Sequence, residues 1–257
     1  MLRNALVLSG LALFTCAPSL AAVRYEQGKA WDVRKTRVLY TESHWTRFAG
    51  SVPVDRTVLY RCADGTPFAR KEIRYSPSVV APAFSFRDVR HDYQEGLLWQ
   101  DGKASLWHSK DGIRKSKPLP AAPNLVADAG FDEFIRSRWS ALSGKERQSL
   151  NFVLPSRLDS YSFSLKHGGK QLYRNEPALA FSLGLAGLLG LVAPDIEVWY
   201  SSDSRRLLRF KGISNIRDDA GEDQIDAIIE FPLQDTVVLP ADKAQAQSVV
   251  LKSCQVS

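Results

Sequence analysis

The chain has 257 residues, of which 44% are hydrophobic and 24% are charged, and its formal net charge at pH 7 is +6. A chain of this length can bury a substantial core without structural metals or several disulfides. Its basic residues form no dense stripe and match no nucleic-acid-binding module, so we expect no nucleic-acid partner. We interpret the moderate positive charge as affinity for anionic envelope surfaces.

The first 22 residues have the pattern of a cleavable secretory signal. Arg3 supplies the positive charge, residues 5–14 form the apolar segment, and residues 19–21 form a small-x-small cleavage site. The apolar segment is too short for a membrane anchor, which needs ~20 residues. Lipidation of Cys16 is an alternative, although the residues before it are bulkier than such a site favours. We therefore expect the protein to be exported with cleavage of this signal.

The first half of the mature chain predicts strands joined by tight turns. Asp-Gly pairs at 64–65, 101–102 and 111–112 separate runs in which apolar and polar residues alternate. Such a pair is a strong hairpin signal because both residues tolerate positive φ. The three pairs predict an antiparallel meander.

Four stretches lack this alternation. Residues 23–30 predict a loosely held N-terminal arm, residues 115–124 a linker, and Gly168-Gly169 a turn. Residues 232–257 predict a poorly ordered C-terminal tail, in which 237–239 or 249–251 can dock on a sheet edge.

One amphipathic helix interrupts the strands at about residues 130–143. Five positions share one face of it: Phe131, Phe134, Ile135, Arg138 and Leu142. The order of strands, one helix, then more strands shows no βαβ rhythm. The predicted fold is therefore mainly β: a large curved antiparallel sheet, as a half-barrel or open barrel, with the helix packed on or in its concave face. Residues 23–231 would form this single domain.

The most apolar part of the mature chain, residues 178–216, leads into its clearest hairpin. Residues 196–201 pair with 207–213, and residues 187–192 predict a tight turn or a single helical turn. Alternation in both strands, with Leu208 and Phe210 assigned to one side, predicts a sheet with one dry face and one basic face.

Two cysteines, Cys62 and Cys254, remain after removal of the signal. In an oxidising compartment they can form a disulfide, but no spacing pattern decides between the paired and the free state. The four histidines are scattered without the spacing of metal ligands, so we expect no metal and no cofactor.

A hydrolase is the least favoured class of function. The chain has no G-x-S-x-G motif. His91-Asp92 and His108 can converge on neighbouring strands, but catalysis would need a nucleophile or second base within about 3 Å of an imidazole. We interpret these histidines as surface or edge residues and expect no catalytic residue and no enzyme activity.

Basic residues gather in two regions of the sequence. One borders the later Asp-Gly turns, and the other lies in the 196–213 hairpin and its turn. Lysines commonly protect sheet edges from pairing, which is the simpler interpretation. Peripheral contact with anionic lipid headgroups or cell-wall polymer is the alternative. The residues are Lys103, Lys110, Arg114, Lys115 and Lys117 in the first region, and Arg205, Arg206, Arg209 and Lys211 in the second.

Four segments together resemble an uncharacterised exported β-rich family of Gram-negative bacteria. They are YRCADGTPFARKEIRY at 60–75, FDEFIRSRW at 131–139, FVLPSRLDSYSF at 152–163 and DIEVWYSSDSRRLLRFKGISNI at 195–216. This resemblance implies no known activity. The architecture more loosely resembles periplasmic half-barrels of the lipoprotein-carrier type, in which a curved sheet holds an apolar cargo and short helices close the opening.

These observations predict a monomeric periplasmic binding or carrier protein for a lipid or acyl chain. The predicted apolar concave site consists of Phe152, Phe163, Leu183, Val198 and Phe210. The alternative is an envelope structural or protein-interaction module whose concavity is a filled core and which binds no small molecule. A deep apolar pocket would distinguish the first function from the second.

Overall fold

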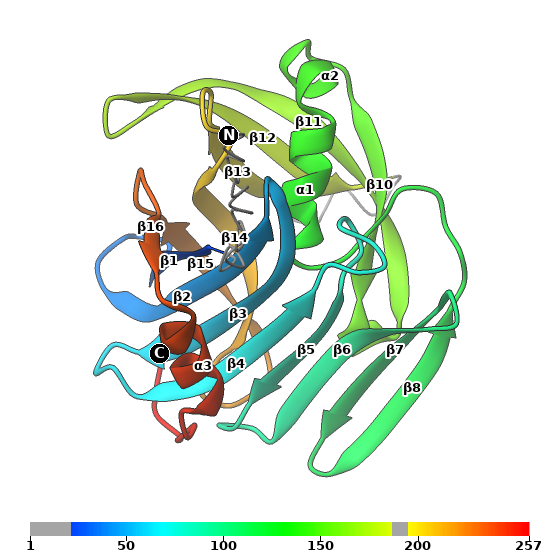
Figure 1. The fold of residues 1–257 in the computed structure, drawn as a ribbon, viewed down its shortest axis with the longest axis vertical. Coiled ribbons are helices and arrows are strands. Elements are labelled where there is room, and N and C mark those ends of the chain that lie inside the picture. Colours follow the sequence, from blue (N-terminus) through cyan, green and yellow to red (C-terminus); the bar gives the residue numbers. More distant parts are fainter. Residues whose placement is uncertain (1–21, 187–194, 257) are drawn as a thin grey trace, which may run out of the picture.

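The computed structural model describes residues 22–186 and 195–256. In this part of the chain, sixteen strands form one open, curved sheet, which Figure 1 shows. The predicted fold class, mainly β with one large curved antiparallel sheet, is confirmed. The predicted signal sequence with Cys16 and the predicted turn at 187–192 lie outside the described residues, except for Ala22.

The first eight strands form an antiparallel meander, and the three Asp-Gly pairs make three of its seven turns as predicted. Positive φ angles at Asp101, Gly102, Asp111 and Gly112 fit tight hairpin turns. The strands are β1 (Val23–Trp31), β2 (Val38–Ala49), β3 (Val52–Cys62), β4 (Pro67–Arg74), β5 (Ala83–Asp88), β6 (Tyr93–Gln100), β7 (Lys103–Lys110) and β8 (Ile113–Leu119).

The remaining strands continue the sheet from the other side of β1, in the order β15, β14, β13, β12, β11, β10 and β9. Only the pairing of the short β9 with β10 is parallel among the described strands. These strands are β9 (Leu125–Val126), β10 (Gln148–Leu154), β11 (Asp159–Tyr173), β12 (Glu176–Leu185), β13 (Ile196–Ser201), β14 (Leu207–Arg217), β15 (Gln224–Glu230) and β16 (Thr236–Val238).

The two ends of the sheet approach each other without pairing. The turn η1 (Pro155–Arg157), between β10 and β11, packs against β6 and β7. Lys117 on β8 lies 3.6 Å from the carboxylate of Asp159 at the start of β11. The curvature therefore brings the inner faces of the two halves opposite each other.

The predicted loose arm, residues 23–30, is instead part of the central strand β1. It pairs with β2 on one side and with β15 and β16 on the other. The alternation of β1 is not recognisable in the sequence, because its inward-facing residues Arg24 and Glu26 line a cavity rather than a dry core.

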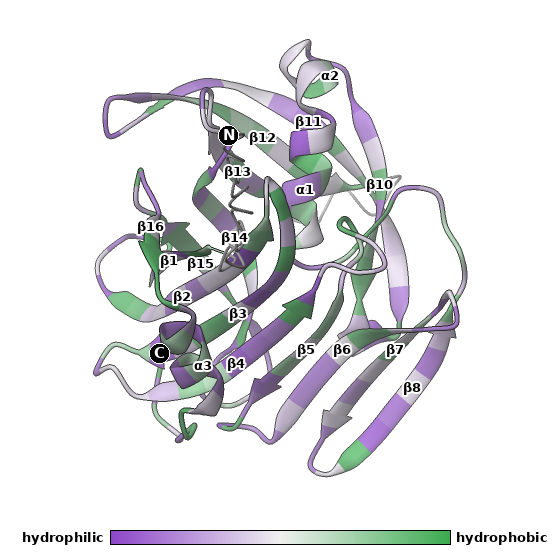
Figure 2. Ribbon diagram, viewed as in Figure 1, coloured by the Kyte–Doolittle hydropathy of each residue, from purple (hydrophilic) through white to green (hydrophobic). Residues whose placement is uncertain are grey.

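Two further predictions of irregular structure are wrong. The first half of the predicted linker at 115–124 belongs to β8, an edge strand exposed everywhere except at Leu119, so it has no apolar face to detect. Figure 2 shows this strand as mainly hydrophilic. The predicted turn at Gly168-Gly169 lies inside the long strand β11, where the register shifts between His167 and Gly169. Gly169, at φ +111°, forms a bulge there.

The predicted helix is present but divided in two. Helix α1 (Gly130–Ser137) and helix α2 (Trp139–Ser143) are separated by Arg138, whose backbone leaves the helical region. Phe134 and Ile135 are buried. Helix α1 lies at the concave side of the sheet (Figure 1).

The predicted poorly ordered tail, residues 232–257, is structured over its described part. Strand β16 pairs with β1, which the sequence offered as one alternative, and helix α3 (Pro240–Ser248) follows. A disulfide joins Cys254 to Cys62, and the amide of Lys252 donates to the carbonyl of Pro67 at 2.8 Å. Because backbone bonds and a disulfide hold this segment, it needs no apolar periodicity.

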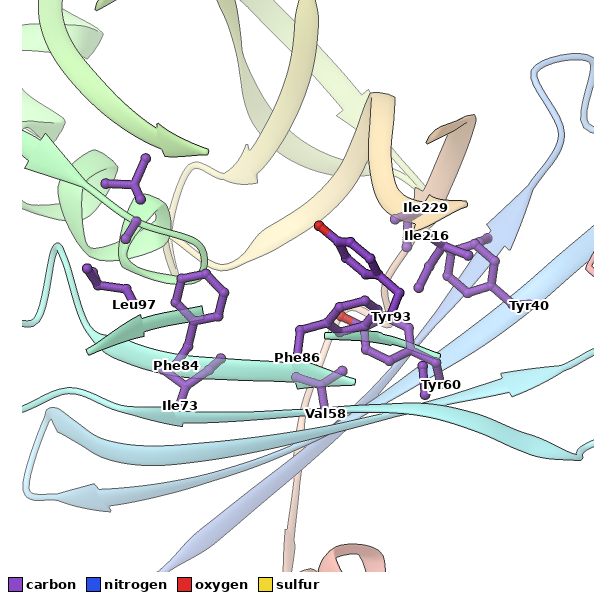
Figure 3. Close-up of a cluster of buried hydrophobic side chains, with 14 of the residues drawn as sticks. Tyr40, Val58, Tyr60, Ile73, Phe84, Phe86, Tyr93, Leu97, Ile216 and Ile229 are labelled. Carbon is purple, nitrogen blue, oxygen red and sulfur yellow. The ribbon is translucent and has the colours of Figure 1, made fainter. Parts of the chain in front are cut away.

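Two large clusters of buried residues support the sheet. The first lies on the inner face of β2 to β6 and is closed by residues of β14 and β15, with Tyr60, Phe86 and Ile229 among its members. Figure 3 shows these side chains pointing toward one another. The second joins α1 and α2 to β10 through β13, where Phe181 packs against Trp139.

Candidate functional site

The concave side of the sheet contains a cavity of about 640 Å³. Helix α1 and both halves of the sheet contribute to its lining. Ligand sites in proteins commonly measure about 300–1,000 Å³, so the cavity is large enough for a small molecule.

One side of the cavity, which we call the apolar wall, consists of lining residues from β10 to β14 together with Phe131 of α1. Its aromatic rings meet edge to face: Phe131 and Phe152 lie 6.1 Å apart between ring centroids, and Phe152 and Phe163 lie 6.2 Å apart. The members are Phe131, Phe152, Phe163, Leu183, Leu185, Ile196, Val198 and Phe210.

All five residues of the predicted concave site lie on the apolar wall. The structure brings Phe152, Phe163, Leu183, Val198 and Phe210 together from five strands, although they span 59 positions of sequence numbering from 152 to 210. Their role as ligand contacts stays a prediction.

One detail of the predicted hairpin faces is wrong. Leu208 and Phe210 do not share a side, because the register between β13 and β14 shifts at Trp199 and Tyr200. Leu207 and Phe210 line the cavity, whereas Leu208 packs with Tyr173 and Ala178 in a separate cluster. A bulge of this kind redirects one side chain without interrupting the strand.

The opposite side of the cavity, which we call the polar wall, is the inner face of β1 to β4 and β6. Strand pairing places Arg24, Thr46 and Arg56 in one row across β1, β2 and β3. The neighbouring row contains Glu26 and His44. The remaining charged members of the wall are Glu42, Lys71 and Glu95.

A buried charged group connects the polar wall to helix α1. Arg56 donates through Nη1 to Oδ2 of Asp132 at 3.3 Å, and the hydroxyl of Tyr200 donates to Oδ1 of Asp132 at 2.8 Å. Burial alone would raise the pKa of Asp132, but Arg136, Arg56 and the Tyr200 hydroxyl outweigh it, so the pKa lies below its usual value. Asp132 is therefore an anion at neutral pH.

The other ions at the cavity are also paired. Arg206 donates to Glu26 at 2.6 Å, Arg136 forms an ion pair with Glu133, and Lys71 with Asp128. Burial raises the pKa of Glu133 above its usual value despite the neighbouring Arg136.

Two further carboxylates are held by uncharged donors or an imidazole. The Tyr93 hydroxyl donates to Glu95 at 2.6 Å, and burial raises the pKa of Glu95. The Nε2 atom of His44 lies 3.1 Å from Glu42. Asp235 lies 3.8 Å from Arg24, so every carboxylate on the cavity lining has a partner.

The histidines considered for hydrolysis do not form a catalytic group. His91 lies in the turn between β5 and β6 beside Gly221, and His108 lies on β7 opposite Glu95. Within the described residues, neither imidazole has a hydrogen bond to a serine, threonine or cysteine side chain. Burial, Lys115 and Arg217 together lower the pKa of His108.

The described part of the chain contains no group of three His, Cys, Asp or Glu side chains arranged to hold a metal ion. None of its helices has the length and apolar character needed to cross a bilayer.

The polar wall was not predicted from the sequence. A signal for it is present in β2, where Glu42, His44 and Thr46 occupy every second position and are all buried. Polar residues at period two indicate one shared face of a strand. The sequence alone does not show that this polar face is the inner face of the sheet.

Comparison with known proteins found a structural similarity but no matching sequence family. The sequence matches no protein-family model and no curated protein. The structure is similar to the crystal structure of a β-barrel-like protein of the domain of unknown function DUF1849 from Brucella abortus, with a TM-score of 0.42 and 9% sequence identity. The match covers 85% of this chain and 98% of that chain. The resemblance to an uncharacterised exported family stays a prediction.

Proposed function

We propose that this protein is a monomeric periplasmic binding or carrier protein whose curved sheet holds an apolar, acyl-chain-like ligand. The observation that carries the proposal is the cavity of about 640 Å³ with one continuous apolar wall. The secretory pattern of the N-terminus supports export, and so does the Cys62–Cys254 disulfide, since disulfides persist mainly in oxidising compartments.

The apolar wall is only partly covered by the protein itself. Phe152, Phe163 and Phe210 are each incompletely buried, although they face the interior of the sheet. Removing apolar surface from water contributes roughly 25 cal/mol per Å². An acyl chain lying along these rings would therefore gain free energy from surface that the fold leaves uncovered.

The alternative is an envelope interaction module with a filled concavity, and the cavity disfavours it. One observation favours an additional surface contact: β8 is exposed and basic, and Ile113 at its turn is 67% exposed. Lysines around an exposed apolar residue suit peripheral contact with an anionic membrane.

Native mass spectrometry of the mature protein purified from the periplasm, followed by lipid extraction, tests the proposed function. We expect a reproducible bound mass that releases fatty acid or phospholipid. Leu183→Arg, which places a charge on the apolar wall, should abolish this mass. Leu172→Arg is the matched control, because Leu172 is 70% exposed near the end of β11. A wild-type protein that remains free of ligand after incubation with lipids would contradict the proposal.

A further inference from the structure

Arg56 is an unusual residue for an apolar cavity. It lies on the polar wall in β3, lines the cavity, and is only 6% exposed. A buried guanidinium normally uses most of its five N–H groups, because leaving them without partners costs free energy.

Arg56 uses few of these groups. Among the described residues, its side chain makes one hydrogen bond, the 3.3 Å bond to Asp132. Its Nε–H is buried without a partner. Asp132 has little capacity for a second hydrogen bond from Arg56, because its other carboxylate oxygen accepts from Tyr200. The guanidinium therefore has donors left over at the cavity.

The carboxylates of the cavity lining, in contrast to Arg56, already have partners. Glu26, Asp128 and Glu133 each have a basic partner, and Glu42 and Glu95 have His44 and Tyr93. An ammonium group entering the cavity would have to share a carboxylate that already has a donor. An acceptor oxygen entering the cavity needs only the free donors of Arg56.

We propose that the ligand is an acidic amphiphile, whose anionic oxygen head is bound by Arg56 while its chain lies on the apolar wall. This inference rests on the proposed function and names the class of ligand for the same cavity. The head group is a carboxylate or a phosphate, since both present oxygen acceptors that an arginine binds in pairs.

The cavity lining contains seven carboxylates and five arginine or lysine side chains, so a bound anion needs compensation, which proton uptake can supply. Arg56, Arg136 and Arg206 are balanced by Asp132, Glu133 and Glu26 before the ligand enters. Because burial raises the pKa of Glu133, a further negative charge nearby favours proton uptake by this carboxylate. Proton uptake at Glu133 would restore the balance.

Competition among ligands of equal chain length tests the inference. In this assay, the protein is loaded with the neutral fluorescent probe N-phenyl-1-naphthylamine. Hexadecanoate, hexadecyl phosphate, hexadecanol and hexadecylamine are then added separately as competitors. Since a hydrogen bond to a charged group contributes about 1.5–3 kcal/mol, at least one anion should bind roughly 10-fold or more tightly than the alcohol. The carboxylate and phosphate results identify which acid is preferred.

Arg56→Gln supplies the second measurement. It should reduce the affinity for the preferred anion to that of hexadecanol and leave hexadecanol binding unchanged. Arg61→Gln is the matched control, because Arg61 is on the same strand but bonds to the carbonyl of Gly65 outside the cavity lining. It should leave all four affinities unchanged.

The outcomes separate the two proposals. Equal binding of the anions and the alcohol by the wild-type protein would overturn the inference and leave the proposed function standing, and so would tighter binding of the amine. If no 16-carbon ligand displaces the probe, both proposals fail. If Arg56→Gln does not fold, the comparison of the four ligands on the wild-type protein still tests the inference.

Discussion

The two halves of the sheet present opposite chemistry to the same cavity. The apolar wall, from β10 to β14, follows the usual rule that inward-facing residues are hydrophobic. The polar wall, on β1 to β4 and β6, places charged residues such as Glu42, Arg56 and Lys71 inward and buries them. Alternation along a strand therefore shows which residues share a face. Whether that face is the inner or the outer one depends on whether the interior is an apolar core or a polar cavity.

The energetic demands of the two walls also differ. The polar wall is stable only if each buried ion has a partner, because an isolated buried charge is very costly. The apolar wall needs no partners, but its exposed rings lose contacts where the cavity is empty. We expect mutations on the polar wall to act through unpaired charges and mutations on the apolar wall to act through lost packing.

Removing the disulfide should have an effect as large as that of any other single change, on the polar half. Cys254 is 192 positions from Cys62, and in the chain-entropy model a loop of that length stabilises the fold by up to about 5 kcal/mol. We expect Cys254→Ser to lower the free energy of unfolding in urea by about 2–5 kcal/mol. Wild-type protein unfolded under reducing conditions should match the variant. An unchanged urea midpoint would show that the tail is held without the bond.

Asp132→Asn tests the pairing of the polar wall. It leaves Arg56 buried without a counterion, and breaking a buried pair in this way costs about 3–5 kcal/mol. Tyr200→Phe removes one hydrogen bond to the same carboxylate and should cost about 1.5–3 kcal/mol. Both losses are measured by urea unfolding at pH 7. A smaller loss for Asp132→Asn than for Tyr200→Phe would contradict the pairing account.

The effect of Asp132 should depend on pH. Its folded pKa lies below the usual 3.8, so its contribution is present above the unfolded pKa and is lost as the pH falls through the folded pKa. The difference in unfolding free energy between wild type and Asp132→Asn should be constant from pH 7 to about 5 and shrink below about pH 4. A difference that grows on acidification would have the wrong sign.

Leu183→Ala tests the apolar wall. Leu183 is buried against the cavity, and truncating a buried leucine costs about 2–4 kcal/mol. Leu172→Ala, at an exposed site on the neighbouring strand β11, should cost less than about 0.5 kcal/mol. Thermal unfolding compares the two. Equal small losses would mean that the apolar wall contributes little to the fold.

A charge outside the cavity should have the smallest effect on stability. Lys115 lies on the exposed strand β8, so Lys115→Glu should change the unfolding free energy by less than about 0.5 kcal/mol. If β8 contacts an anionic membrane, each lysine contributes about 1 kcal/mol, and the variant should bind phosphatidylglycerol vesicles at least about 5-fold more weakly. Lys145→Glu, in the exposed segment after α2, is the control for nonspecific charge effects.

Apolar alternation and turn chemistry predicted much of the fold. The Asp-Gly turns, the position of the helix and the strand faces carrying Val198 and Leu183 follow from local patterns. The predicted site residues meet in one cavity because each lies on the apolar side of its own strand.

Local patterns could not predict three features. Strand β1 carries Arg24 and Glu26 toward the cavity, so its inward face looks like that of a solvated arm. The bulges at Gly169 and near Leu208 depend on register with a neighbouring strand, which no single segment records. The order of the C-terminal tail depends on contacts with β1, Pro67 and Cys62, which lie far away in the sequence.

A ligand in this cavity should lie with its chain on the apolar wall and its head toward Arg56. A 16-carbon fatty acid with a photoreactive diazirine at its terminal carbon tests this directly, with cross-linked peptides located by mass spectrometry. We predict cross-links in β10 to β14, at residues such as Phe163, Leu183 and Val198. Cross-links concentrated in β1 to β4, or on the outer face of the sheet, would contradict this account.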